Sequence, residues 1–128
     1  MAGTVTVTTT TAARTLKKYS AACVSTAGGA VSANPITFAS GGVATSIKIV
    51  PASGGTQPTD LFDVTVVDAD GVDILGGQGG DCSNAVGEYF QLDPPIPIAS
   101  GGTLDVVIAN AGSAKAVRVD IFVEGVRE

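Results

Sequence analysis

Short runs of alternating apolar and polar residues, each closed by Gly, Pro or Asp, constrain the fold of this chain more than any other feature. Four such runs are clear, at residues 43–50, 61–67, 103–110 and 116–123. They are rich in β-branched residues, which suit a pleated, half-buried surface. The pattern predicts an all-β chain, an antiparallel β-sandwich of jelly-roll or immunoglobulin-like type with about eight strands.

The middle of the chain, residues 54–80, is expected to be the unit around which the sheet is organised. Residues 61–67 form the first predicted strand, and 68–71 (Asp-Ala-Asp-Gly) form a tight turn. Asp and Gly tolerate the backbone angles that hairpin turns require, so residues 72–75 are predicted to return as an antiparallel strand.

A second hairpin is predicted near the C-terminus, from strands 103–110 and 116–123 joined by residues 111–114. Period-two alternation assigns the faces of both strands. The outward set is Asp105, Arg118 and Asp120, and the inward set is Leu104, Val106, Ile108, Val117, Val119, Ile121 and Val123.

Further strands are predicted at residues 15–25, 36–38, 43–50 and 88–92, and a helix is the competing interpretation for 15–25. In 43–50 the alternation turns Ser46 and Lys48 away from the core.

Residues 93–97 contain three prolines and predict an extended edge or a crossover. The glycine-rich stretch 76–87 predicts a surface loop and a candidate contact loop. The inward face of 43–50 comprises Val43, Thr45, Ile47 and Ile49.

The chain is expected to divide into residues 1–12, an extended N-terminal arm or edge strand, and a single β-sandwich domain at 13–128. The run TVTVTTTT at 4–11 suits either an edge strand or an arm that pairs with a neighbouring subunit. The candidate partner-contact residues are Thr4, Val5, Thr6, Val7, Thr8, Gln78 and Asn84.

Composition argues against several classes of function. A formal net charge of −5 disfavours nucleic-acid binding, which depends on clustered Lys and Arg. The chain has no His, the commonest general base, so we expect neither an enzyme nor a bound cofactor. No apolar run approaches the roughly 20 residues that span a bilayer, and a secretory signal is lacking. We therefore expect synthesis in the cytoplasm and no membrane partner.

Three motifs have a functional interpretation and a plainer one. Asp68, Asp70 and Asp73 have the spacing of a calcium loop without its distal Glu, and a hairpin turn explains them without metal. Cys23 and Cys82 are read as two reduced thiols, with a disulfide as the alternative. Three aromatic rings suit a sugar-stacking platform, and the plainer interpretation is packing in the core or against another subunit. These rings are those of Tyr19, Tyr89 and Phe90.

Two motifs, TQPTDLFDVTVVDADGVD in the middle and GGTLDVVIANAG near the end, resemble small virion structural proteins of tailed bacteriophages and prophages. The likeness covers about the last two thirds of the chain. It implies a structural part of the particle with no catalytic residues. Acidity favours a place on the outside of a capsid shell, away from packaged DNA.

The first expectation is therefore a capsid decoration (cement) protein, made in the bacterial host, that binds the major capsid protein, copies of itself or both. The alternatives are a neck or tail structural protein and a carbohydrate-binding or host-adhesion module.

Overall fold

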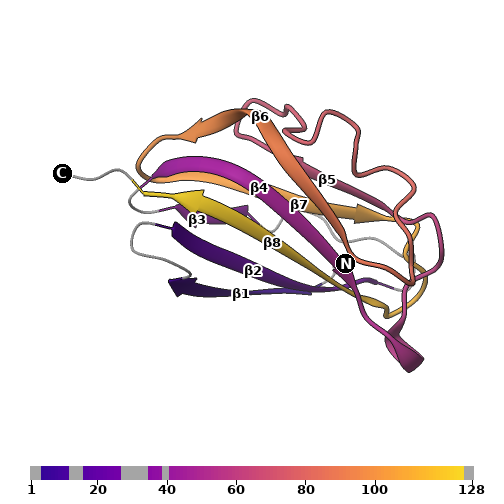
Figure 1. Ribbon diagram of the computed structural model, residues 1–128. Coiled ribbons are helices and arrows are strands. Elements are labelled where there is room, and N and C mark those ends of the chain that lie inside the picture. Colours follow the sequence, from indigo (N-terminus) through magenta and orange to yellow (C-terminus); the bar gives the residue numbers. More distant parts are fainter. Residues whose placement is uncertain (1–3, 12–15, 27–34, 39–40, 126–128) are drawn as a thin grey trace.

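A computed structural model describes residues 4–11, 16–26, 35–38 and 41–125 of the chain (Figure 1). These residues contain eight strands and one short 3₁₀ helix, joined by turns and loops. The all-β prediction is confirmed. In chain order the elements are β1 (Thr4–Thr11), β2 (Leu16–Val24), β3 (Pro35–Phe38), β4 (Gly42–Pro51), η1 (Gly54–Thr56), β5 (Asp63–Val67), β6 (Glu88–Ile98), β7 (Gly102–Ala109) and β8 (Ala116–Glu124).

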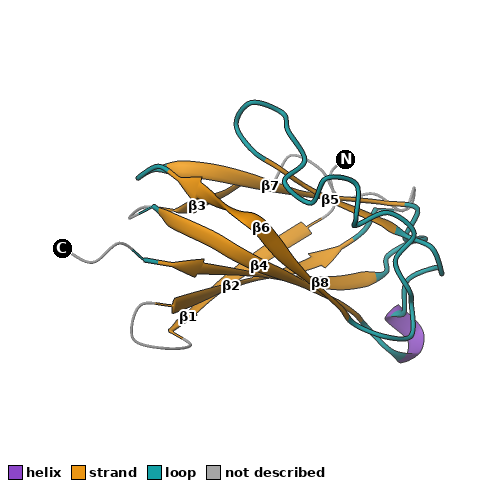
Figure 2. Cartoon of the chain, turned by 45° about the horizontal axis from the view of Figure 1, so that its top comes forward, coloured by secondary structure: helices purple, strands orange, loops and turns teal. Residues whose placement is uncertain are grey.

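The strands form two antiparallel sheets that lie face to face (Figure 2). The larger sheet has the order β1-β2-β8-β4-β6, and the smaller has the order β3-β7-β5. Residues 1–3, 12 and 15 of the predicted arm and second strand lie outside the described residues.

The core lies between the sheets and consists mainly of Val, Ile and Leu. Alternation along each strand supplies the core residues, because every second side chain of a strand points to the same face. The predicted inward residues of β7 and β8 are all buried, which confirms those assignments. Tyr19 of β2 packs edge-on against Phe38 of β3, with ring centroids 4.6 Å apart, and so joins the two sheets at one side of the sandwich.

The predicted C-terminal hairpin is wrong, because β7 and β8 belong to different sheets. The chain crosses from one layer to the other at residues 110–115, where Ala111 is fully buried. The Ser25 hydroxyl donates to the Gly112 carbonyl (2.6 Å) and accepts from the Lys115 N–H (2.9 Å). With this crossover the apolar faces of β7 and β8 meet across the core. Period-two alternation is the same whether two strands face each other across a sandwich or pair side by side in one sheet, so the sequence pattern did not distinguish the two arrangements.

The predicted central hairpin is also wrong in its second half. β5 spans Asp63–Val67, but residues 72–75 form no strand: Asp73 makes a single bridge with Val67, and residues 74–75 lie in a turn. Moreover, β5 is an edge strand of the smaller sheet, so this unit is not the centre of the fold. Glycines and aspartates that suit a hairpin turn suit a winding surface segment equally well.

A β-bulge corrects the predicted faces of β4. The pairing with β8 shifts between Ala44 and Ser46, so alternation changes phase there. Ala44 is buried and Val43 and Thr45 are only half-buried, whereas Ile47 and Ile49 are core residues as predicted. The predictions for β2, β3 and the edge position of the proline-rich stretch, now part of β6, are confirmed.

Candidate interaction surface

The free edges of the two sheets are the places where this fold can meet another chain by backbone hydrogen bonds. An unpaired edge exposes a row of N–H and C=O groups, and proteins usually protect such edges. The two sheets have four edge strands, β1 and β6 in the larger sheet and β3 and β5 in the smaller.

The edge of β5 is closed by the chain itself. Residues 73–82 run along it, and the Val64 N–H donates to the Gly79 carbonyl (2.8 Å). The Ile74 N–H donates to the Val66 carbonyl (2.8 Å), and the Val66 N–H donates to Asp73 Oδ1 (3.1 Å). These bonds replace a neighbouring strand, so the edge of β5 is not open to a partner.

The edges of β6 and β3 are poor templates for pairing. β6 includes Pro94, Pro95 and Pro97, which have no N–H to donate. β3 has only four residues and begins with Pro35. Short strands and prolines are two of the devices that prevent edge-to-edge association.

The edge of β1 has none of these protections among the described residues. Its eight residues, TVTVTTTT, include no charge, Pro or Gly, and all eight pair with β2 in a continuous register from Thr4↔Val24 to Thr11↔Lys17. Within the described ranges no backbone hydrogen bond reaches β1 from a segment other than β2. Five of the candidate contact residues, 4–8, lie on this edge strand.

The other two candidate contact residues lie on the opposite side of the sandwich. Gln78 is exposed in the segment that covers β5 and lines a depression shared with β6 residues. Asn84 holds that segment in place, because its side-chain amide donates to the Pro58 carbonyl (3.2 Å) and its own carbonyl accepts from Gln57 Nε2 (2.9 Å). The segment that contains Gln78 and Asn84 covers β5, on the side of the sandwich away from β1, so the fold does not bring these two residues together with residues 4–8.

The acidic turn is held by hydrogen bonds within the chain. Asp68 Oδ1 accepts from the N–H groups of Asp70 (2.9 Å) and Val72 (3.0 Å). Asp73 accepts from the N–H groups of Val66, Leu75 and Gly77 at 3.0–3.1 Å. Across the described ranges, no group of three or more His, Cys, Asp or Glu side chains is arranged to hold a metal ion. The turn interpretation explains the carboxylates without calcium.

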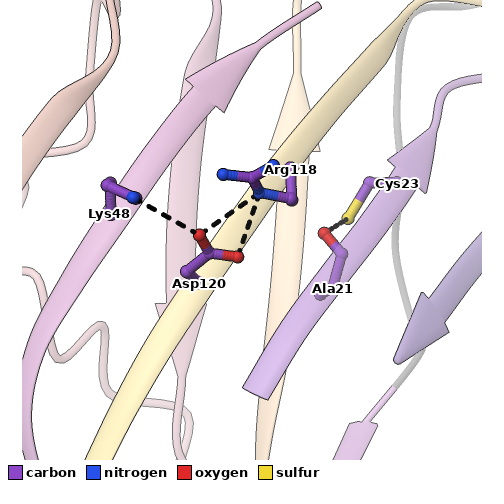
Figure 3. A network of polar contacts seen from close by, with 5 residues as sticks. All are labelled: Ala21, Cys23, Lys48, Arg118 and Asp120. Atoms are coloured by element: carbon purple, nitrogen blue, oxygen red, sulfur yellow. Dashed lines mark hydrogen bonds and ion pairs between the residues drawn. The ribbon is translucent and has the colours of Figure 1, made fainter. Parts of the chain in front are cut away.

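A charge cluster of one carboxylate and two cations, which the sequence did not predict, lies on the outer face of the larger sheet (Figure 3). Asp120 was expected on this face but in solvent, and its side chain has no exposed surface. Arg118 Nε lies 3.2 Å from both Asp120 oxygens, and Lys48 Nζ lies 3.9 Å from Oδ2. Lys48 stands directly opposite Asp120 in the β4–β8 register, a relationship that is visible only once the strand pairing is known.

A shallow depression of about 240 Å³ lies next to Arg118, at the end of the larger sheet where β2, β4 and β8 meet. Small and apolar side chains line it, and Val24 is 41% exposed there. The lining includes Ala22, Val24, Val50, Pro51, Ala52 and Ala116.

Both cysteines are buried and free, in agreement with the reduced-thiol interpretation and against a disulfide. The Cys23 thiol donates to the Ala21 carbonyl (3.6 Å; Figure 3) and the Cys82 thiol donates to the Gly79 carbonyl (3.1 Å). Burial raises the pKa of each thiol to about 12, and the charge of Glu88 adds to the effect at Cys82. Neither thiol is a nucleophile at neutral pH, because the thiolate is the reactive form.

The three rings considered for sugar stacking do not form one platform. Tyr19 lies on β2, whereas Tyr89 and Phe90 lie on β6 at the far edge of the same sheet. Tyr89 is 63% exposed on the outer face, where it contacts Phe122, and Phe90 packs against the core. Stacking of a sugar on adjacent rings is therefore not available here.

Comparison of the chain with protein-family models, curated proteins and solved structures finds no match in any of the three. Within the described residues, no helix is long and apolar enough to cross a membrane. The fold is an all-β sandwich, and among its described residues no segment other than β2 hydrogen-bonds to the edge strand β1.

Proposed function

We propose that this chain is a structural protein of a tailed-bacteriophage virion, a capsid decoration protein that binds the outer shell and stabilises it without chemistry. The observation that carries the proposal is the edge of β1, which no described segment covers, set against three edges that are covered, short or interrupted by proline. Edge strands add to neighbouring sheets through main-chain hydrogen bonds, and such contacts repeated over a shell would sum to a large stabilisation.

Two further features support a place on the outside of a capsid. The motifs in the middle and C-terminal parts resemble those of phage virion proteins, and the net charge of −5 disfavours contact with packaged DNA. The major capsid protein, other copies of this chain or both are the partners we propose, and we propose no catalytic activity and no cofactor.

Cryo-electron microscopy of intact particles, compared with particles from a strain that lacks the gene, tests this proposal. We expect density for the sandwich at repeated sites on the outer capsid surface, and earlier bursting of the mutant particles on heating or at low ionic strength. Density only at the neck or tail would exclude decoration and assign the chain to those structures. Particles with no density for the chain would exclude a virion role.

A further inference from the structure

Strand β1 exposes an apolar side chain on the side of the sheet that elsewhere faces the core. Val7 is paired with Ala21 of β2, which is fully buried, and directly opposite residues in an antiparallel pair point to the same face. Val7 is nevertheless 41% exposed. It lies on the outermost strand of the larger sheet, which has five strands, whereas the smaller sheet has three.

The edge of β1 thus combines two features that favour association. Its backbone groups on the side away from β2 have no partner among the described residues, and Val7 adds apolar surface beside them. A neighbouring strand would form hydrogen bonds with these backbone groups and would cover the apolar surface of Val7.

We propose that this neighbour is β1 of a second copy, which pairs antiparallel to the first about a two-fold axis perpendicular to the sheet. The two larger sheets then become one continuous sheet. The inference goes beyond the proposed function, because it concerns the protein in solution and holds whether or not the chain is part of a virion.

The sequence of β1 is complementary to itself in this arrangement. A two-fold axis perpendicular to the sheet keeps each face on the same side, so odd-numbered positions meet odd ones and even meet even. A register centred on Thr6 places Val5 opposite Val7 of the second copy, and Thr4 opposite Thr8. Apolar pairs and Thr–Thr pairs in directly opposite positions favour strand pairing.

Charge favours the same occupant. Each copy has a net charge of −5, so most of the surface disfavours self-association. β1 has no charged residue, and its neighbour β2 contributes only the cations Lys17 and Lys18, which pair with Thr11 and Thr10 at one end. Two copies can therefore meet along β1 without placing their carboxylates together.

Analytical ultracentrifugation of the full chain tests the proposal, with Val7→Lys as the main variant. We expect the parent to be a dimer at micromolar concentration and Val7→Lys to be a folded monomer, because two like charges would then face the same interface. Val72→Lys is the matched control: Val72 is an exposed valine (57%) in the turn after β5, so this variant should remain a dimer. Far-ultraviolet circular dichroism would establish that all three are folded.

Cross-linking tests the register. In the register centred on Thr6, a Thr6→Cys variant places two thiols directly opposite each other, and mild oxidation should yield a covalent dimer. Thr9→Cys separates the equivalent thiols by several residues and should not cross-link. A monomeric parent, a Val7→Lys variant that dimerises as well as the parent, or cross-linking at Thr9 but not at Thr6 would each overturn the proposal. None of these outcomes depends on where the protein lies on a particle.

Discussion

Asp120 and Arg118, two residues apart on β8, contact each other at 3.2 Å although Asp120 is fully buried and 46% of the Arg118 side chain is exposed. Arg118 and Lys48 both lie beside this carboxylate on the outer face of the sheet. The two members of this pair therefore differ in what their loss would cost: a cation left alone can turn to solvent, and a buried carboxylate cannot.

Arg118→Ala should destabilise the protein more than Asp120→Asn does. Loss of Arg118 leaves a buried charge with one distant partner, Lys48, and we expect a cost of about 1–3 kcal/mol in the free energy of unfolding. Asp120→Asn leaves two half-exposed cations that water can solvate, at a cost of about 1 kcal/mol or less. Urea unfolding of both variants measures the difference, with Glu124→Ala as an exposed control. Equal losses would contradict this account of Asp120.

Gly79→Ala should open the edge of β5. A Cβ at this position would overlap the Val64 carbonyl oxygen, so the covering segment would have to move away and lose the hydrogen bond from Val64 to Gly79. Loss of that bond and of the packing around it should cost about 2 kcal/mol and lower the melting temperature by several degrees.

Gly80→Ala is the matched control for this effect. A Cβ at residue 80 meets nothing closer than the Gly77 carbonyl oxygen at 3.4 Å, an ordinary contact, and neither Gly79 nor Gly80 requires a positive φ. Thermal unfolding followed by circular dichroism should therefore show little change for Gly80→Ala. A similar drop for both variants would mean that residue 79 has no special role at the edge.

The sequence predicted which side chains are buried better than it predicted which strands are neighbours. Alternation gave the core residues of β7 and β8, such as Ile108 and Val119, because burial of one face requires only a period of two. It did not show that the two strands lie in different sheets, since a short connection can join strands within a sheet or across a sandwich. The bulge in β4 was missed for a related reason: an extra residue changes the phase without any change in composition.

The sequence indicated part of where the candidate contact residues lie in the fold, and that they contact a partner stays a prediction. The charge-free Thr run at 4–11 indicated an edge strand, and the structure has β1 there. Gln78 and Asn84 were grouped with it only because both lie in a polar, glycine-rich loop. That loop instead closes the edge of β5 through long-range hydrogen bonds such as Asn84 to Pro58, and spacing along the chain does not reveal these bonds.

The buried thiols should make stability depend on pH in the alkaline range. Burial raises the pKa of Cys23 and Cys82 from 9.0 to about 12, so the folded chain retains both protons where the unfolded chain loses them. This contribution is fully present below pH 9 and is lost as the pH rises towards 12, by about 1.4 kcal/mol per pH unit for each thiol.

Urea unfolding at a series of pH values above 9 would measure this slope. The Cys23→Ala/Cys82→Ala variant provides the comparison, since the two proteins differ only in the thiols. We expect the variant to be less stable at pH 8, because it loses buried volume, and to lose less stability than the parent as the pH rises. Parallel slopes would contradict the effect of burial on these thiols.

Asp73 should matter as a hydrogen-bond acceptor and not as a calcium ligand. Its carboxylate accepts three backbone N–H groups, from Val66, Leu75 and Gly77, and so supports both the turn and the edge of β5. Asp73→Ala removes all three bonds and should cost about 2–3 kcal/mol. Asp73→Asn keeps a carbonyl oxygen in the position of Oδ1, which receives Val66 and Leu75, and should cost less.

Chelation separates this role from metal binding. If calcium bound Asp68, Asp70 and Asp73, EGTA would lower the melting temperature of the parent and added calcium would restore it, because a ligand that binds only the folded state stabilises that state. We expect neither reagent to change the melting temperature of the parent. Without metal, the free energy of unfolding should decrease in the order parent, Asp73→Asn, Asp73→Ala.

Asp70→Ala is the control, because the Asp70 carboxylate accepts no hydrogen bond found among the described residues and lies in solvent. A calcium-dependent melting temperature that Asp70→Ala abolished would establish a metal site in this turn and reverse the interpretation.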